Sequence, residues 1–192
     1  TARLLAERGD SVVLLDRQPH AEAVASIVSS PRVQLLTGDV TDFSALMQLS
    51  AAHGVDTVVH TAALLSTAIR RDPLQGIHVN VMGTANVLEL ARQRALRRVV
   101  LASSSTVGYQ AFEGFDGAAF PEDFAMRFLQ HRPASIYVGS KVTGEYLGLL
   151  YRDLYGVSVV ALRYAAVISA WRGPGTSVPG KVLSSLLLPA RR

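Results

Sequence analysis

The stretch TARLLAERGDSVVLLDR (1–17) carries the pattern that decides the fold. Residues 1–8 are expected to be the second half of a helix, because leucines supply its apolar side and Gly9 stands where a left-handed C-terminal cap belongs. Residues 11–15 then form an apolar run that ends at an acid, Asp16. A helix that leads into a buried strand is the second half of a β-α-β unit. The first strand of that unit is therefore expected to precede this sequence.

Apolar runs of strand length alternate with helical periodicity along the rest of the chain. The runs are rich in Val and Leu without alternation, as in parallel strands that are covered on both faces. The expected strands are residues 11–16, 32–39, 56–63, 97–104 and 157–165. The expected helices after the first are residues 41–54, 79–93 and 134–156. This order predicts an α/β fold, a doubly wound parallel sheet of the Rossmann type.

The strand that the sequence lacks is the central one in a sheet of order 3-2-1-4-5-6. Unpaired ladder groups in a buried layer cost about 1–3 kcal/mol each, so the sequence is expected to be a fragment of a longer protein. Residues 1–170 are expected to form an N-terminally incomplete Rossmann domain, and residues 171–192 the start of a substrate domain. The Gly- and Pro-rich residues 111–133 are expected to form a functional or mobile loop.

Composition excludes several classes of protein. Hydrophobic residues make up 49% of the chain and charged residues 18%, which predicts a packed core. No apolar run reaches the ~18 residues of a membrane span. The absence of cysteine excludes disulfides and thiolate metal sites, and it suits a cytoplasmic protein. The net charge is +4, but no basic stripe is interleaved with aromatic residues, so a nucleic-acid partner is not expected.

The pentapeptide YVGSK (137–141) is the sharpest chemical signal. Tyr137 and Lys141 are four residues apart on an expected helix, so both side chains project from one face. The pairing is notable because the chain has two lysines against seventeen arginines. A neighbouring ammonium favours a phenolate, so we expect the pKa of Tyr137 to be lowered and its phenol to act as an acid and base.

Polar residues also stand where expected strands end, which is where ligands bind in open α/β sheets. The SSST stretch (103–106) offers a hydroxyl that could hold a substrate oxygen. Asp16 could accept hydrogen bonds from an adenosine ribose and repel the extra phosphate of NADP, although Arg17 beside it could tolerate that phosphate. His60 is expected to be a hydrogen-bonded histidine at a strand end, and no metal site is expected.

These segments together resemble the extended short-chain dehydrogenase/reductase superfamily, in particular its NAD-dependent epimerase/dehydratase family. The segments that carry the resemblance, in order, are LLAERGDSVVLLDR (4–17), GDVTD (38–42), VVHTAA (58–63), HVNVMGTANVLELAR (78–92), RRVVLASSSTVGY (97–109), YVGSK (137–141) and ALRYAAV (161–167). The resemblance implies an NAD(P)-binding Rossmann domain, a Ser-Tyr-Lys catalytic set and a small C-terminal substrate domain.

The resemblance assigns roles by position. It implies that Tyr137 is the catalytic acid and base, that Lys141 lowers its pKa and holds the nicotinamide ribose, and that Ser104 is the catalytic serine, with Ser105 as the second choice. The remaining residues would line the cofactor site. They are Asp16, Arg17, Asp39, Val40, Thr61, Ala62, Ala63, Leu64, Asn80 and Tyr164, together with Tyr137 and Lys141.

The sequence also departs from the family pattern. The glycine-rich phosphate loop is missing, VGY (107–109) stands where VYG is usual, and Ala166 stands where nucleotide-sugar enzymes often have an asparagine. We expect an NAD-dependent enzyme, with NADP not excluded, that acts on a secondary alcohol of a sugar or sugar nucleotide. A hydroxysteroid-type or sugar-acid dehydrogenase and a non-catalytic dinucleotide-binding protein are the alternatives. The fragment alone is expected to be inert, and the resemblance allows a homodimer.

Overall fold

The computed structural model describes residues 1–111 and 135–167. The described residues form two compact units, one made of Thr1–Asp39 with residues 166–167 and the other made of residues 40–111 with 135–165. The domain boundary expected after residue 170 and the loop expected at 111–133 lie almost wholly outside the described residues, so both stay predictions.

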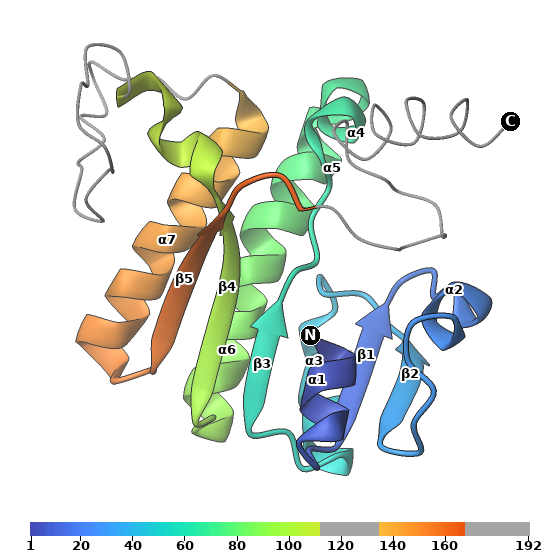
Figure 1. Cartoon of the computed structure of the whole chain (residues 1–192). Coiled ribbons are helices and arrows are strands. Elements are labelled where there is room, and N and C mark those ends of the chain that lie inside the picture. The colour runs from blue at the N-terminus through green and yellow to red at the C-terminus, as the bar shows by residue number, and fades with distance from the viewer. Residues whose placement is uncertain (112–134, 168–192) are drawn as a thin grey trace, which may run out of the picture. The chain divides into compact units, whose positions relative to one another are not determined.

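The first unit contains a short parallel β-sheet of two strands (Figure 1). Its elements are α1 (Ala2–Glu7), β1 (Val12–Asp16), α2 (Ala21–Ala25) and β2 (Val33–Thr37). The strands pair with Val12 opposite Val33 and Asp16 opposite Thr37. Gly9 follows α1 with φ of 101°, which confirms the expected left-handed end of that helix.

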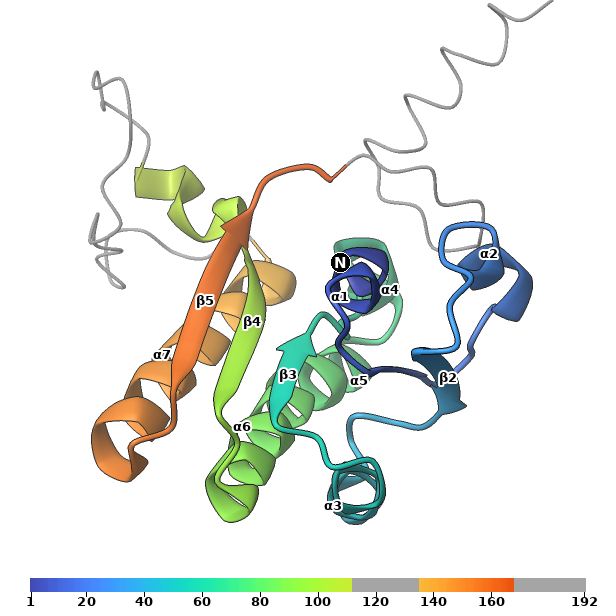
Figure 2. The same cartoon turned by 60° about the horizontal axis from the view of Figure 1, so that its bottom comes forward.

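The second unit is a three-stranded parallel sheet covered by helices. Its elements are α3 (Phe43–Ala52), β3 (Thr57–His60), α4 (Ser66–Arg71), α5 (Pro73–Ile77), a π-helical turn (His78–Met82), α6 (Gly83–Arg94), β4 (Arg98–Ser104), a 3-10 turn (Ser105–Ala111), α7 (Ile136–Tyr155) and β5 (Val159–Tyr164). The strand order is β3-β4-β5, and Figure 2 shows α6 and α7 lying against the same face of this sheet.

The strand pairs are those that the order 3-2-1-4-5-6 predicts on either side of its first strand. β1 pairs with β2, β3 with β4, and β4 with β5, all in parallel. In the described ranges, no ladder of hydrogen bonds joins β1 to β3. The α/β class and the parallel pairing are therefore confirmed.

Caps and glycines explain where the longer helices begin and end. The Asp42 carboxylate accepts a hydrogen bond of 2.9 Å from the Ala45 N–H at the start of α3. The Ser135 hydroxyl accepts one of 3.2 Å from the Val138 N–H at the start of α7. Gly156 ends α7 with φ of 70°, a left-handed conformation that glycine adopts without steric cost.

Three short helices were not expected from the sequence, namely α2, α4 and α5. Each has only five or six residues, too few to display a helical period of apolar positions. The helix expected at 79–93 begins instead with the π-helical turn His78–Met82 and continues as α6. A π turn inserts one residue into an otherwise regular helix, which the apolar pattern does not register.

The core of the second unit lies between its sheet and the α6–α7 pair. Leu88 of α6, Val99 of β4 and Val142 of α7 are its largest fully buried side chains. Among the residues that the structure describes, no helix is long and apolar enough to cross a membrane.

We predict that Leu88→Ala lowers the free energy of unfolding by about 2–5 kcal/mol, because Leu88 is 0% exposed and its removal leaves a cavity. Leu74→Ala is the matched control, since Leu74 is 78% exposed and should change stability by less than about 0.5 kcal/mol. Urea unfolding of both variants measures the difference. Equal losses of stability would contradict the assigned core.

Candidate active site

The second unit brings Ser104, Tyr137 and Lys141 together. Ser104 is the last residue of β4, and Tyr137 and Lys141 lie one turn apart at the start of α7. The Ser104 and Tyr137 hydroxyls are hydrogen bonded to each other, and the Lys141 Nζ lies 5.7 Å from the centre of the Tyr137 ring.

Packing and hydrogen bonds fix the orientation of these groups. The Tyr137 ring packs against the buried cluster of Val107, Val138 and Val142. The Thr106 hydroxyl lies 2.8 Å from the Ser104 Oγ, to which it donates a hydrogen bond. Side chains that are held in this way are pre-organised for chemistry.

The pKa of Tyr137 differs from the expected direction. Burial raises it above its ordinary value, and the hydrogen bond from Ser104 opposes that rise. Burial is the physical reason, and the Lys141 Nζ directs a hydrogen bond of 2.7 Å at the Ala102 carbonyl. Burial also lowers the pKa of Lys141. The expected depression of the Tyr137 pKa by the ammonium is therefore wrong for the protein without a ligand.

His60 is the buried, hydrogen-bonded histidine that the sequence suggests. It ends β3 with 7% exposure, and its Nε2 lies 3.0 Å from the Thr84 Oγ1. The Thr84 hydroxyl donates its own proton to the Asn80 carbonyl, so it accepts from the Nε2–H of a neutral imidazole. Burial and the charge of Lys141 lower the pKa of His60 to about 4.

Asn80 ties the segment after β3 to the start of α7. Its Oδ1 accepts a hydrogen bond of 2.7 Å from the Leu64 N–H, and its Nδ2 donates to the Leu64 carbonyl and the Ser140 Oγ at 3.0 and 3.1 Å. Both amide hydrogens are thereby used. Asn80 thus fixes the Leu64 backbone, and its contact with a cofactor stays a prediction. The π turn that contains it is a feature common at functional sites.

Other predicted site residues of this unit lie at the carboxyl ends of strands. Thr61 and Ala62 follow β3 and are exposed, while Ala63 and Leu64 are half-buried. Tyr164 ends β5 directly opposite Ser104 in the ladder and is exposed. Val40, predicted as an adenine contact, packs against the first residue of α6. A Cβ on Gly83 would come within 2.6 Å of the Val40 Cγ1.

Three predicted residues belong to the first unit. Asp16 ends β1, is exposed, and accepts a hydrogen bond of 2.8 Å from the Gln18 N–H through one carboxylate oxygen. Arg17 is exposed and Asp39 half-buried. Their relation to Tyr137 stays a prediction. In residues 1–111 and 135–167, no three His, Asp or Glu side chains gather as metal ligands would.

Sequence reasoning missed one polar group beside the site. Glu145, on α7, accepts hydrogen bonds from Ser103 of β4 and Arg163 of β5. The available signal was spacing, because Glu145 lies one turn after Lys141 and two turns after Tyr137 on the same helix.

Known proteins resemble this chain over most of its length. A model of the NAD dependent epimerase/dehydratase family matches residues 1–191. The mitochondrial L-threonine 3-dehydrogenase of Sus scrofa is 33% identical over 166 residues, which is 86% of this chain and 41% of that protein. The UDP-glucuronate 4-epimerase 1 of Arabidopsis thaliana is 28% identical over 177 residues, or 88% of this chain and 40% of that protein.

Solved structures agree with these relatives. The UDP-glucose 4-epimerase of Thermus thermophilus in complex with NAD has a TM-score of 0.74 and 26% identity, and the match covers 95% of this chain and 56% of that one. The chain spans about 40% of the length of the curated relatives it matches.

The depressed pKa of His60 predicts how stability depends on pH. The unfolded chain takes up a proton near pH 6.5, whereas folded His60 does so only near pH 4. The free energy of unfolding should therefore fall by about 3 kcal/mol as the pH drops from 6.5 to 4. Urea titrations of His60→Gln should be flatter over this range, while the exposed His53→Gln should follow the parent. A His60→Gln curve parallel to the parent would contradict the shift.

Proposed function

This chain belongs to the NAD dependent epimerase/dehydratase family, and we propose that it acts as an NAD-dependent oxidoreductase or epimerase on a secondary alcohol. The proposed substrate is a sugar or a sugar nucleotide. The observation that carries the proposal is the hydrogen bond between the Ser104 and Tyr137 hydroxyls beside the Lys141 ammonium. A protein that only bound a dinucleotide would have no need of these three groups together.

The proposed chemistry assigns one task to each group. NAD, when bound, supplies the acceptor for a hydride. Tyr137 as phenolate takes the proton of the substrate hydroxyl, and the Ser104 hydroxyl holds the oxygen to which that proton was attached. Burial disfavours the phenolate, so a positive charge must oppose it. In the proposed reaction, with NAD bound, Lys141 on the same face of α7 would supply that charge.

The residues around the proposed site fit NAD. Ala62 and Ala63 have small side chains, so a cofactor could approach the backbone after β3, and Asn80 fixes the Leu64 backbone beside them. In the first unit, the exposed Asp16 carboxylate offers an acceptor for a ribose. Arg17 keeps NADP open as an alternative. Direct contacts by Asp39, Val40 and Tyr164 remain part of the proposal.

A second candidate is the oxidation of a β-hydroxy amino acid such as L-threonine. The observation that favours it is the 33% identity to the L-threonine 3-dehydrogenase of Sus scrofa over 86% of this chain. L-Threonine also carries a secondary alcohol, so the roles of Ser104, Tyr137 and Lys141 would be the same. Ala166, where nucleotide-sugar enzymes often have an asparagine, is compatible with this candidate and with a sugar acid.

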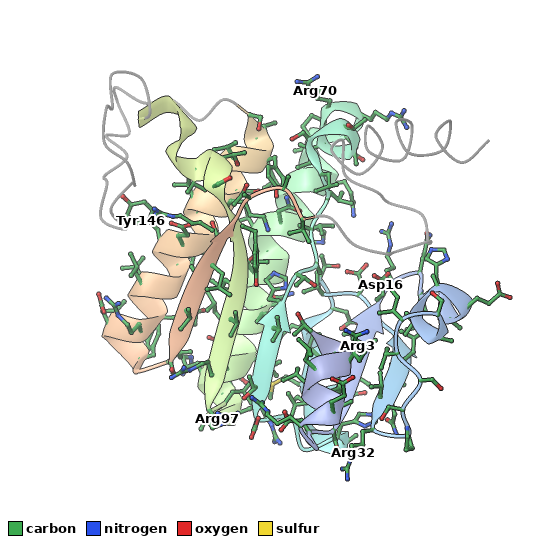
Figure 3. All side chains as sticks on the ribbon, viewed as in Figure 1. Arg3, Asp16, Arg32, Arg70, Arg97 and Tyr146 are labelled. Carbon is green, nitrogen blue, oxygen red and sulfur yellow. The ribbon has the colours of Figure 1, made fainter. Side chains whose placement is uncertain are left out.

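A pocket beside Tyr137 suggests that the substrate carries a carboxylate. The pocket has a volume of about 210 Å³ and lies between α4, α5 and the start of α7. Arg70 lines it together with the Ser66 and Ser135 hydroxyls, and among the described residues Arg70 makes no ion pair. Arg70 extends from α4 at the end of the unit opposite Arg97, which directly precedes β4 (Figure 3). A guanidinium suits a carboxylate.

A homodimer also remains a proposal. Three leucines of α7, Leu149, Leu150 and Leu154, are 45%, 50% and 66% exposed. An apolar helix face of this kind is typical of a surface that another chain covers. Analytical ultracentrifugation of the protein expressed from its complete gene would measure the oligomeric state.

The catalytic proposal predicts that Tyr137→Phe lowers kcat by about 10²- to 10⁴-fold, because the phenyl ring cannot accept a proton. The Kd of NAD should change by less than about threefold. The first assay follows the NADH that forms during oxidation of L-threonine, and the second follows the epimerised sugar that forms from UDP-glucuronate. Both use the protein expressed from its complete gene. Tyr155→Phe, on the same helix, is the control that should keep full activity. Substantial turnover by Tyr137→Phe would refute the assignment.

The pocket predicts that Arg70→Met raises the KM of a carboxylate substrate by about tenfold, because one charge-assisted hydrogen bond is lost. The KM of UDP-galactose, whose sugar lacks a carboxylate, should be unaffected. Arg71→Met is the matched control, because Arg71 is the adjacent exposed arginine and does not line the pocket. The proposed carboxylate site at Arg70 is wrong if Arg70→Met and Arg71→Met give the same KM for the carboxylate substrate.

A further inference from the structure

We propose that Glu145 is a positioning residue, whose carboxylate fixes α7 against the ends of β4 and β5 so that Tyr137 and Lys141 meet Ser104. We call the group Ser103, Glu145 and Arg163 the carboxylate clamp. This inference rests on the proposed function, because positioning has meaning only if those three residues react.

The clamp joins three elements through one carboxylate. The Ser103 Oγ donates to the Glu145 Oε1 at 2.5 Å. The Arg163 Nε donates to the Oε1 at 3.0 Å, and its Nη2 donates to the Oε2 at 2.7 Å. Two parallel bonds from a planar guanidinium define direction as well as distance. The Glu145 side chain is 14% exposed, so water screens this pair less than a surface ion pair.

Each member of the clamp is a close neighbour of a predicted site residue. Ser103 precedes Ser104, and Arg163 precedes Tyr164. The ladder pairs Ser103 with Arg163 and Ser104 with Tyr164, so the clamp lies one residue before the ends of both strands. Glu145 lies one helical turn beyond Lys141. The clamp thus fixes the register between α7 and the sheet next to the reacting groups.

Apolar packing alone would fix that register less well. Where α7 meets β4, a Cβ on Gly148 would lie 3.3 Å from the Leu101 Cδ1, so the contact is close but has no preferred direction along the helix. The other polar links from α7 to β4 in the described ranges are those of Tyr137 to Ser104 and Lys141 to Ala102. Both involve the reacting groups themselves. The clamp holds the helix without using either.

The clamp also keeps the carboxylate away from the lysine. Lys141 and Glu145 have the i, i+4 spacing at which opposite charges commonly pair on a helix, and both line one small pocket. Ser103 and Arg163 engage both oxygens of Glu145 instead. In the described part of the chain, Lys141 forms no ion pair, so its charge stays available to Tyr137.

The chain offers a closely matched control in Glu89. Its carboxylate accepts two hydrogen bonds from Arg92, at 2.9 and 2.6 Å, and one of 3.2 Å from the Tyr151 hydroxyl of α7. Glu89 therefore combines an arginine fork with a hydroxyl from another element, as Glu145 does. None of these partners is a neighbour of the proposed site.

The test compares Glu145→Gln with Glu89→Gln in the protein expressed from its complete gene. We expect Glu145→Gln to lower kcat by about tenfold or more, since a displacement of about 1 Å can cost 10²-fold, while the KM of NAD stays within about twofold. Glu89→Gln should keep kcat within about twofold even if both variants unfold at the same lowered temperature. Equal kcat values for the two variants would overturn the proposal.

Two further variants separate the remaining outcomes. If Glu145→Gln fails to fold, Ser103→Ala keeps the arginine pair and should still lower kcat without changing the KM of NAD; an unchanged kcat there would overturn the proposal. If Tyr137→Phe is inactive but Glu145→Gln behaves like Glu89→Gln, only the clamp is wrong. If Tyr137→Phe is active, the proposed function itself fails.

Discussion

The close approach of α7 to β4 is the constraint on which the described site depends. The inward face of α7 carries Ser140, Gly144 and Gly148, all buried and spaced by four residues. A Cβ on Gly148 would already be tight, at 3.1 Å from the Val159 Cγ1. Gly148 lets the helix lie near the sheet, whereas a Cβ on Gly144 would face Thr84 of α6 at 3.5 Å, and Ser140 is hydrogen bonded to Asn80. Lys141 can then reach the Ala102 carbonyl at 2.7 Å, and Tyr137 can reach Ser104.

The parallel sheet explains why the proposed catalytic groups come from distant parts of the sequence. In a parallel sheet, all strands end on one side, so the residues after β3, at the end of β4 and at the end of β5 lie near one another. Asn80 adds a link from a helix, through its bonds to Leu64 and Ser140. Loop backbone and helix are thereby held together by one buried amide.

Much of this arrangement could be predicted from local sequence, but the polar contacts between distant residues could not. Val- and Leu-rich runs located the strands, and Gly9 and Gly156 marked helix ends because each needs a positive φ. The four-residue spacing of Tyr137 and Lys141 predicted that both side chains lie on one face of a helix. The direction of the Tyr137 pKa shift could not be predicted, because burial by distant parts of the chain raises it and the ammonium is bonded to the distant Ala102 carbonyl. The Glu145–Arg163 pair joins a helix to a strand, and no local pattern encodes it.

The two pKa shifts at the site have a common cause and an electrostatic consequence. Burial raises the pKa of Tyr137 and lowers that of Lys141, so it favours the neutral form of both. A phenolate beside an ammonium avoids part of this penalty, because opposite charges attract strongly where water is excluded. The two groups should therefore titrate as a pair, and a pH profile of activity would report the pair and not the tyrosine alone. Because Arg163 engages Glu145, no carboxylate on α7 competes with Tyr137 for the lysine charge.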